Sequence, residues 1–412
     1  MKFNIITLGC KVNTYESNFM AEKLLERGFI FCDDNKKCDI IIINTCTVTN
    51  NSDKKSLKLV RRAKRENPKA ILIVCGCSVQ YDKNNYQNLD IDILIGNQKK
   101  SEIAFLIEEY LKSKKKYEYI NNDKNISFEN MMINKFNQVR SYIKIQDGCN
   151  NFCSYCIIPF VRGNIRCKDF NLIIKEANIL VNNGYKEIVL TGIHTGSYYN
   201  TGKDLVDLIN ELSKINDLKR IRLSSVEITE LNDKFIDMLK INKVFCNHLH
   251  IPLQSGSDEM LKIMNRKYNT KDYEAKINII RSIIPDISIT TDVIVGHNFE
   301  TDNLFNETYE FCKKIKFSKI HVFPFSKRKK TASSLMKGEV PLNIKKARVL
   351  KLISLSEYLE KKYYNKFVNK KMDILIEEVK NNKSIGHTSN YLKVTLNEIL
   401  NVGFIYNRKI DE

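Results

Sequence analysis

The chain has 412 residues, 43% hydrophobic and 28% charged, a composition that argues against a disordered chain and a collagen and favours two or three folded domains. No apolar run approaches the roughly 18 residues that a membrane-spanning helix needs, so we expect no membrane association. The formal net charge of +19 favours polyanionic partners, above all nucleic acid, although a biased composition rich in Lys, Asn and Ile would give the same charge.

The twelve cysteines indicate the cellular compartment. The N-terminal Met1-Lys2-Phe3 is a poor secretory signal, so we expect a reducing cytoplasm. Clustered cysteines in that compartment indicate metal or redox chemistry rather than disulfides.

The first predicted domain covers residues 1–112. Short apolar runs, typical of strands, alternate there with helical patterns over residues 15–27 and 52–66, and this alternation predicts an open parallel sheet with crossover helices. The strands are expected at residues 3–8, 39–43, 70–74 and 91–95. The polar residues 113–136 follow and are interpreted as a connector.

The second predicted domain covers residues 137–366 and again alternates strands with helices. About six such units indicate a partial (β/α)6 barrel rather than a complete eight-stranded one. Its strands are expected at residues 141–146, 187–191, 220–225, 247–252, 287–294 and 320–324, with a long helix at 344–367. Residues 367–412 instead predict a small all-β barrel with strands at 372–378, 391–396 and 402–406.

The strongest local pattern is Cys149-x3-Cys153-x2-Cys156, in a loop just after the first barrel strand. Four thiolates would close a structural zinc site or an ordinary four-iron cluster, whereas three leave one iron open to a substrate or cofactor. The loop lies where barrel enzymes place their chemistry, at the carboxyl end of a strand. A chance match or a zinc site is the alternative.

A second group of cysteines is dispersed. Cys10, Cys46 and Cys77 each follow the end of a predicted parallel strand, and such ends meet at one edge of a sheet. The three thiolates are therefore expected to hold a second cluster; three buried, inert cysteines are the alternative. Cys75 is the alternative to Cys77 as the third ligand. We choose Cys77 because Gly76 suggests that the strand ends in a turn.

These residues together resemble the methylthiotransferase family of radical S-adenosylmethionine (SAM) enzymes, in which an aromatic residue, here Tyr155, precedes the last cysteine. The resemblance covers nearly the whole chain. Within the family, the segments 7–13 and 44–49 resemble the bacterial branch that acts on threonylcarbamoyladenosine in tRNA, and the C-terminal segment 386–391 resembles the RNA-binding TRAM domain. One departure is His297-Asn298-Phe299, where the family usually has Phe-Pro-Gly.

The resemblance implies two four-iron clusters and SAM as cofactors. Cys149, Cys153 and Cys156 would hold the cluster at which SAM is cleaved to a radical, and an external donor, which the sequence does not identify, would supply the electron. Cys10, Cys46 and Cys77 would hold the auxiliary cluster that carries the transferred sulfur. Tyr155, Glu227 and Gln254 are expected to contribute to the SAM pocket, although each could equally have an ordinary structural role.

The implied reaction adds a methylthio group to carbon 2 of N6-threonylcarbamoyladenosine beside the anticodon, with tRNA as the substrate and a monomer as the expected state. The alternatives are isopentenyladenosine in tRNA, a ribosomal protein, or a non-enzymatic RNA-binding protein with structural zinc. Residues 361–412 carry ten Lys and Arg against six Asp and Glu, so this tail alone does not explain the expected RNA affinity.

Overall fold

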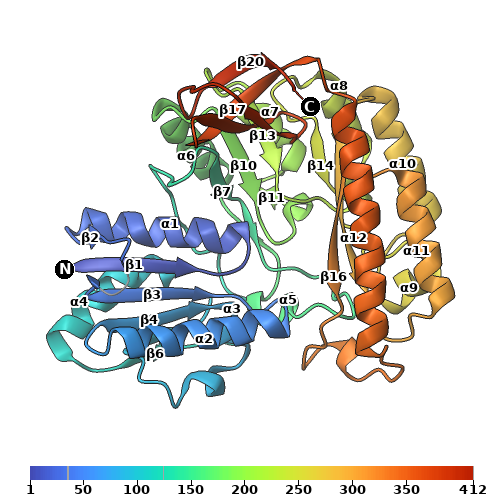
Figure 1. Cartoon of the computed structure of the whole chain (residues 1–412). Helices are drawn as coiled ribbons and strands as arrows, with labels where there is room; N and C mark the ends of the chain where they lie inside the picture. The colour runs from blue at the N-terminus through green and yellow to red at the C-terminus, as the bar shows by residue number, and fades with distance from the viewer. Residues whose placement is uncertain (35–36, 124, 412) are drawn as a thin grey trace.

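The computed structural model describes residues 1–34, 37–123 and 125–411. An N-terminal α/β domain lies beside a larger α/β half-barrel, and a small C-terminal sheet covers one end of that half-barrel (Figure 1). The predicted α/β class and the order of the three parts are confirmed.

The N-terminal sheet is parallel and has six strands in the order β2-β1-β3-β4-β5-β6. The central strands β3 and β4 are buried along their whole length, which explains their nearly continuous apolar sequences. Two hydrophobic clusters cover the two faces, one packed by α1 and α4 and the other by α2. The elements are β1 Lys2–Thr7, α1 Lys11–Glu26, β2 Ile30–Phe31, β3 Ile40–Thr45, α2 Asn50–Glu66, β4 Ile71–Gly76, α3 Cys77–Tyr81, β5 Ile93–Ile95, α4 Ile103–Ser113 and β6 Tyr117–Tyr119.

The segment expected to be a connector contributes to both neighbouring domains. Its residues Tyr117–Tyr119 form the edge strand β6, whose mixed polar pattern did not predict a strand. Further along, Met131, Ile133 and Phe136 are buried against Tyr15 and Phe19 of α1.

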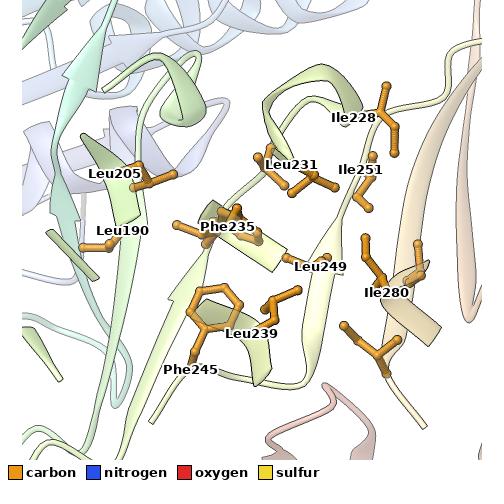
Figure 2. Packing of buried hydrophobic residues seen from close by; sticks show 14 of the residues in the cluster. Leu190, Leu205, Ile228, Leu231, Phe235, Leu239, Phe245, Leu249, Ile251 and Ile280 are labelled. Carbon is orange, nitrogen blue, oxygen red and sulfur yellow. The ribbon is translucent and has the colours of Figure 1, made fainter. Parts of the chain in front are cut away.

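Six parallel strands form the half-barrel. They lie in two three-stranded sheets, β13-β10-β7 and β14-β15-β16, and the bridge between Ile221 and Phe245 connects the two. The predicted partial barrel is therefore confirmed. Figure 2 shows how side chains from its strands and covering helices, among them Leu190, Phe235 and Leu249, point toward one another in the core.

The strands of the half-barrel are β7 Ser141–Lys144, β10 Glu187–Thr191, β13 Arg220–Leu223, β14 His248–His250, β15 Ser288–Val295 and β16 Lys319–Pro324. Its helices are α5 Ile158–Arg162, α6 Phe170–Asn182, α7 Leu205–Leu212, α8 Asp233–Ile241, α9 Asp258–Ile263, α10 Thr270–Ile283, α11 Asp302–Ile315 and α12 Leu342–Asn365. Two short antiparallel pairs, β8 Gln146–Asp147 with β9 Arg166–Cys167 and β11 Tyr199–Asn200 with β12 Lys203–Asp204, lie in its loops.

The C-terminal strands form a four-stranded antiparallel sheet in the order β19-β18-β17-β20. Arg220, the first residue of β13, donates to backbone carbonyls of this sheet, and His248, the first residue of β14, stacks on Tyr391. The sheet therefore covers the N-terminal ends of the barrel strands. Its elements are β17 Lys371–Lys380, β18 Lys383–Thr388, which the sequence did not predict, β19 Lys393–Leu396 and β20 Ile405–Lys409.

No helix in the described part of the chain is long and apolar enough to cross a membrane.

Candidate active site between two cysteine triplets

The loop of the first triplet begins where β7 and β8 end. At its entrance Gly148 has a φ of +75°, and a Cβ atom there would overlap the carbonyl oxygen of Asn164, so this close backbone approach requires glycine. The loop that follows carries Cys149, Cys153 and Cys156 and leads directly into α5.

Two cationic or polar side chains from the barrel approach the thiols of this loop. Nη1 of Arg266 donates to Sγ of Cys153 at 3.3 Å, and Nδ1 of His194 lies 3.8 Å from Sγ of Cys149. Carboxylates hold both partners, since Glu227 pairs with Arg266 and Glu230 pairs with His194. Glu227, predicted as a SAM-pocket residue, thus reaches the thiols through Arg266.

The second triplet lies at the carboxyl ends of three adjacent strands. Cys10 follows β1 and precedes α1, Cys46 follows β3, and Cys77 is the first residue of α3 after β4. Gly9 has a φ of +105°, and a Cβ atom there would lie 2.9 Å from Sγ of Cys46. The turn before Cys10 therefore packs directly on Cys46.

The thiols within each triplet are close enough to influence one another's charge. Burial, reinforced by the sulfurs of Cys153 and Cys149, raises the pKa of Cys156 to about 12. Burial likewise raises the pKa of Cys46 to about 11, with Cys77 and Cys10 acting in the same direction. Cysteine binds metals as the thiolate, so such crowded, buried thiols are suited to a group with positively charged metal atoms.

The thiols of the two triplets are not placed as ligands of a single ion. Zinc with Zn–S bonds of about 2.3 Å would hold its sulfurs at most about 4.6 Å apart. Among the described residues, the set with ligand atoms all within 4.8 Å of one another is His250, Asp292 and His321, and neither cysteine triplet meets that limit. As placed, neither triplet is closed around a single zinc ion, and three thiolates suit the iron–sulfur core that the sequence pattern indicates.

Cys75 and Cys77 point to different surroundings. The Cys75 side chain belongs to the hydrophobic cluster between the sheet and helices α1 and α4, and burial raises its pKa to about 12. Cys77 instead packs against Ile157 and Val161, next to the first triplet. Gly76, with a φ of +103°, ends the strand between them, as its position suggested.

The segments that carry the two triplets meet at the contact between α3 and α5. The Cys77 thiol donates to Oδ1 of Asn97 at 3.4 Å, and Nδ2 of Asn97 donates to the carbonyl oxygen of Val161 at 2.7 Å. One amide side chain thus connects a residue of the second triplet to the helix that follows the first.

A cavity of about 190 Å³ opens beside this contact. Of the three residues that the sequence predicted for a SAM pocket, Tyr155 and Gln254 line this cavity. Glu227 is not among its lining residues. Its walls come from the loop after Cys46, the loop of the first triplet and the carboxyl ends of β15 and β16; the lining residues are Val48, Thr49, Tyr155, Cys156, Ile157, Ile158, Gln254, Asp292, Ile294, Phe323, Pro324, Phe325 and Ser326.

Polar side chains of three adjacent strands form one side of the barrel mouth. Nε2 of His250 lies 3.3 Å from Oδ1 of Asp292, which lines the cavity, and His321 stands beside them. Burial lowers the pKa of His321, so a neutral imidazole is favoured there. These atoms can bind a cation or hydrogen-bond a polar ligand.

Arg162, at the end of α5, is a buried residue that the sequence reasoning missed. It donates to Asp147 at 3.0 Å and to Asn13 at 2.8 Å, and its charge interacts with those of Cys77 and Cys10. Its Nε atom is buried and has no hydrogen-bond partner among the described residues. A buried donor beside two sulfurs fits a cluster whose sulfur atoms accept hydrogen bonds.

The unusual turn after Gly296 is firmly held. Phe299 adopts a φ of +66° and its amide donates to Gly338 at 2.8 Å. The His297 ring is fully buried, with Nε2 2.8 Å from Oγ of Ser333 and 3.4 Å from Oγ of Ser154. His297 thus supports the loop between Cys153 and Cys156.

Comparison with known proteins gives matches over almost the whole chain. Residues 2–96 match the family described as Uncharacterized protein family UPF0004, and residues 143–312 match the Radical SAM superfamily. Threonylcarbamoyladenosine tRNA methylthiotransferase MtaB of Bacillus subtilis is 40% identical, over 97% of this chain and 94% of its own. The tRNA-2-methylthio-N(6)-dimethylallyladenosine synthase of Thermodesulfovibrio yellowstonii is 34% identical, over 98% and 95%.

Among solved structures, the radical SAM methyltransferase TsrM of Kitasatospora setae aligns with a TM-score of 0.57 and 14% identity, over 78% of this chain and 74% of its own. At that identity the match shows a shared fold.

Proposed function

Since the chain belongs to the methylthiotransferase family of radical SAM enzymes, we propose that it transfers a methylthio group to carbon 2 of N6-threonylcarbamoyladenosine in tRNA. Relatives named for that substrate are up to 40% identical, whereas those named for dimethylallyladenosine reach 34%. The observation that carries the proposal is the packing of Cys77 of one cysteine triplet against the helix that follows the other, beside a cavity that Cys156 lines.

Within this proposal, Cys149, Cys153 and Cys156 hold the cluster that binds SAM, and Cys10, Cys46 and Cys77 hold the auxiliary cluster. Support comes from the position of Cys10, Cys46 and Cys77 at the ends of three adjacent strands and from the unpartnered Nε of Arg162. When bound, the clusters and SAM supply the one-electron chemistry, the sulfur and the methyl group that acid–base side chains cannot provide.

The protein's own residues bind and orient the reactants. Tyr155 and Gln254 line the cavity and are proposed to contact SAM, whereas Glu227 acts as a positioning residue that holds Arg266 against Cys153. Asp292 lines the cavity and, with His250 and His321 beside it, is proposed to offer hydrogen-bond partners for the adenine base. Phe323 and Phe325 give the same cavity an apolar side that limits the entry of water.

The test is anaerobic reconstitution with iron, sulfide, SAM and a reductant, followed by incubation with tRNA that carries threonylcarbamoyladenosine. Mass spectrometry of the digested nucleosides should reveal the 2-methylthio derivative. Parallel incubations with isopentenyladenosine tRNA and with ribosomal proteins test the alternatives, and methylthiolation of one of those substrates alone would contradict the proposed specificity.

We expect a monomer in the cytoplasm that takes its electron from an external donor.

A further inference from the structure

Helix α2 carries a row of basic side chains on its solvent face. Lys54, Lys58, Arg61 and Arg65, here called the basic row, follow the spacing i, i+4, i+7 and i+11, which places them on one side of a helix. The opposite side is buried through Ser56, Val60 and Ala63. The fold therefore fixes the direction in which the basic row points.

The four side chains of the basic row are exposed and have no ion-pair or hydrogen-bond partner among the described residues. Two other basic residues of the same helix are neutralised, since Arg62 pairs with Glu66 and Lys64 pairs with Asp90. A shallow hollow along the helix is lined by Lys54, Leu57, Lys58, Arg61, Arg62 and Arg65. Four unpaired charges along one hollow favour an extended polyanion.

The basic row starts at the cavity. Thr49, the N-cap of α2, lines the cavity, and the amide of Asn50 donates to Ser326, which also lines it. At 1.5 Å per residue, the basic row extends from about 8 Å to about 24 Å from Thr49 along the helix axis. Figure 1 shows α2 on the outside of the N-terminal sheet with one end beside α5.

The C-terminal sheet is less suited than α2 to bind an extended polyanion beside the cavity. Residues 371–411 carry six Lys and Arg against five Asp and Glu, whereas α2 carries seven against two. The sheet also covers the N-terminal ends of the barrel strands, while the cavity lies at their carboxyl ends. The charge that the tail lacks is thus present on α2.

We propose that the basic row binds backbone phosphates of the tRNA substrate and thereby holds the modified loop over the cavity. This inference rests on the proposed function and adds the surface that carries the RNA. Phosphate contacts position a nucleic acid without reading its sequence, so the basic row supplies affinity and register while the cavity selects the base.

The experiment measures binding of a fluorescein-labelled anticodon stem-loop RNA to the reconstituted full chain at several salt concentrations. The test variant changes Lys54, Lys58, Arg61 and Arg65 to Gln, and the matched control changes Lys135, Lys243, Lys316 and Lys361 to Gln. The control residues are also exposed, and their side chains have no ion-pair or hydrogen-bond partner among the described residues. Iron content and circular dichroism verify that both variants fold, and a variant with Arg61→Lys and Arg65→Lys keeps the charge.

We expect the test variant to bind at least about tenfold more weakly and its salt dependence to fall by about three counterions, while the control and the Arg-to-Lys variant stay near wild type. Equal losses of RNA affinity in the test and control variants would overturn the assignment of RNA binding to the basic row. Such a result would leave the proposed function standing. Absence of RNA binding by the wild type would overturn both. Normal RNA binding by the test variant, with slower reduction by an acidic electron-transfer protein but not by dithionite, would assign the basic row to the electron donor instead.

Discussion

At the residue scale, the site depends on buried polar side chains whose partners lie far away in the sequence. Arg162 shows this most clearly, because it connects Asn13 of the N-terminal domain with Asp147 of the barrel while its Nε has no hydrogen-bond partner among the described residues. Hydrogen bonds to cluster sulfurs raise the reduction potential of an iron–sulfur cluster. Arg162 is therefore expected to tune the auxiliary cluster.

We predict that Arg162→Lys shifts the potential of the auxiliary cluster to more negative values, because lysine keeps the charge but lacks the fixed Nε donor. The measurement is a redox titration followed by electron paramagnetic resonance, in a background where Cys149, Cys153 and Cys156 are alanine. Arg166→Lys is the control, since Arg166 shares Asp147 as a partner. Identical potentials for wild type and Arg162→Lys would contradict this role.

His297 gives a prediction about pH. Burial lowers its pKa to about 4, so as pH falls the unfolded chain, with an ordinary value near 6.5, takes up the proton first. Stability is therefore lost between about pH 6.5 and 4, and the loss from this group is about 3 kcal/mol. Urea unfolding should show that the free energy of unfolding of His297→Gln falls less than that of the wild type over this pH range. Equal pH dependence in the two proteins would rule out a buried neutral imidazole at His297.

At the element scale, hydrophobic periodicity predicted the strands of both α/β domains because their apolar runs are buried on both faces. The predicted strand positions also placed Cys10, Cys46 and Cys77 at one edge of the sheet, because the carboxyl ends of parallel strands meet at the same edge. Periodicity missed β6 and β18, which are short and mixed in polarity. It could not find Arg162 or the pairing of Glu227 with Arg266, because such contacts join distant segments and leave no local pattern.

The boundary between β4 and α3 yields a direct comparison of two neighbouring cysteines. Cys77→Ala should lose the auxiliary cluster, about four irons per chain, because Cys77 lies outside the core at the contact with α5 and is the proposed third ligand. Cys75→Ala should keep the iron and lose only about 1 kcal/mol of stability, because its thiol packs in the core. Iron analysis and urea unfolding check both variants, and iron loss confined to Cys75→Ala would reverse the assignment.

At the scale of the whole molecule, the site exists because two domains are held in one arrangement. Glu16 of α1 is fully buried and pairs with Lys100 of its own domain, with Lys144 of β7 at 2.8 Å and with Arg162 of α5 at 3.2 Å. Burial raises the pKa of Glu16, but these three cations outweigh it and hold the carboxyl ionised. A paired charge network across the contact fixes the geometry in which the segments that carry the triplets meet.

The central claim, that two cysteine triplets hold two clusters in one chain, is tested most directly by iron and sulfide analysis after anaerobic reconstitution. The wild type should bind about eight irons with matching sulfide, and changing Cys10, Cys46 and Cys77 together to alanine should leave about four. Zinc without sulfide in the wild type, or an unchanged iron content in the triple variant, would contradict the account.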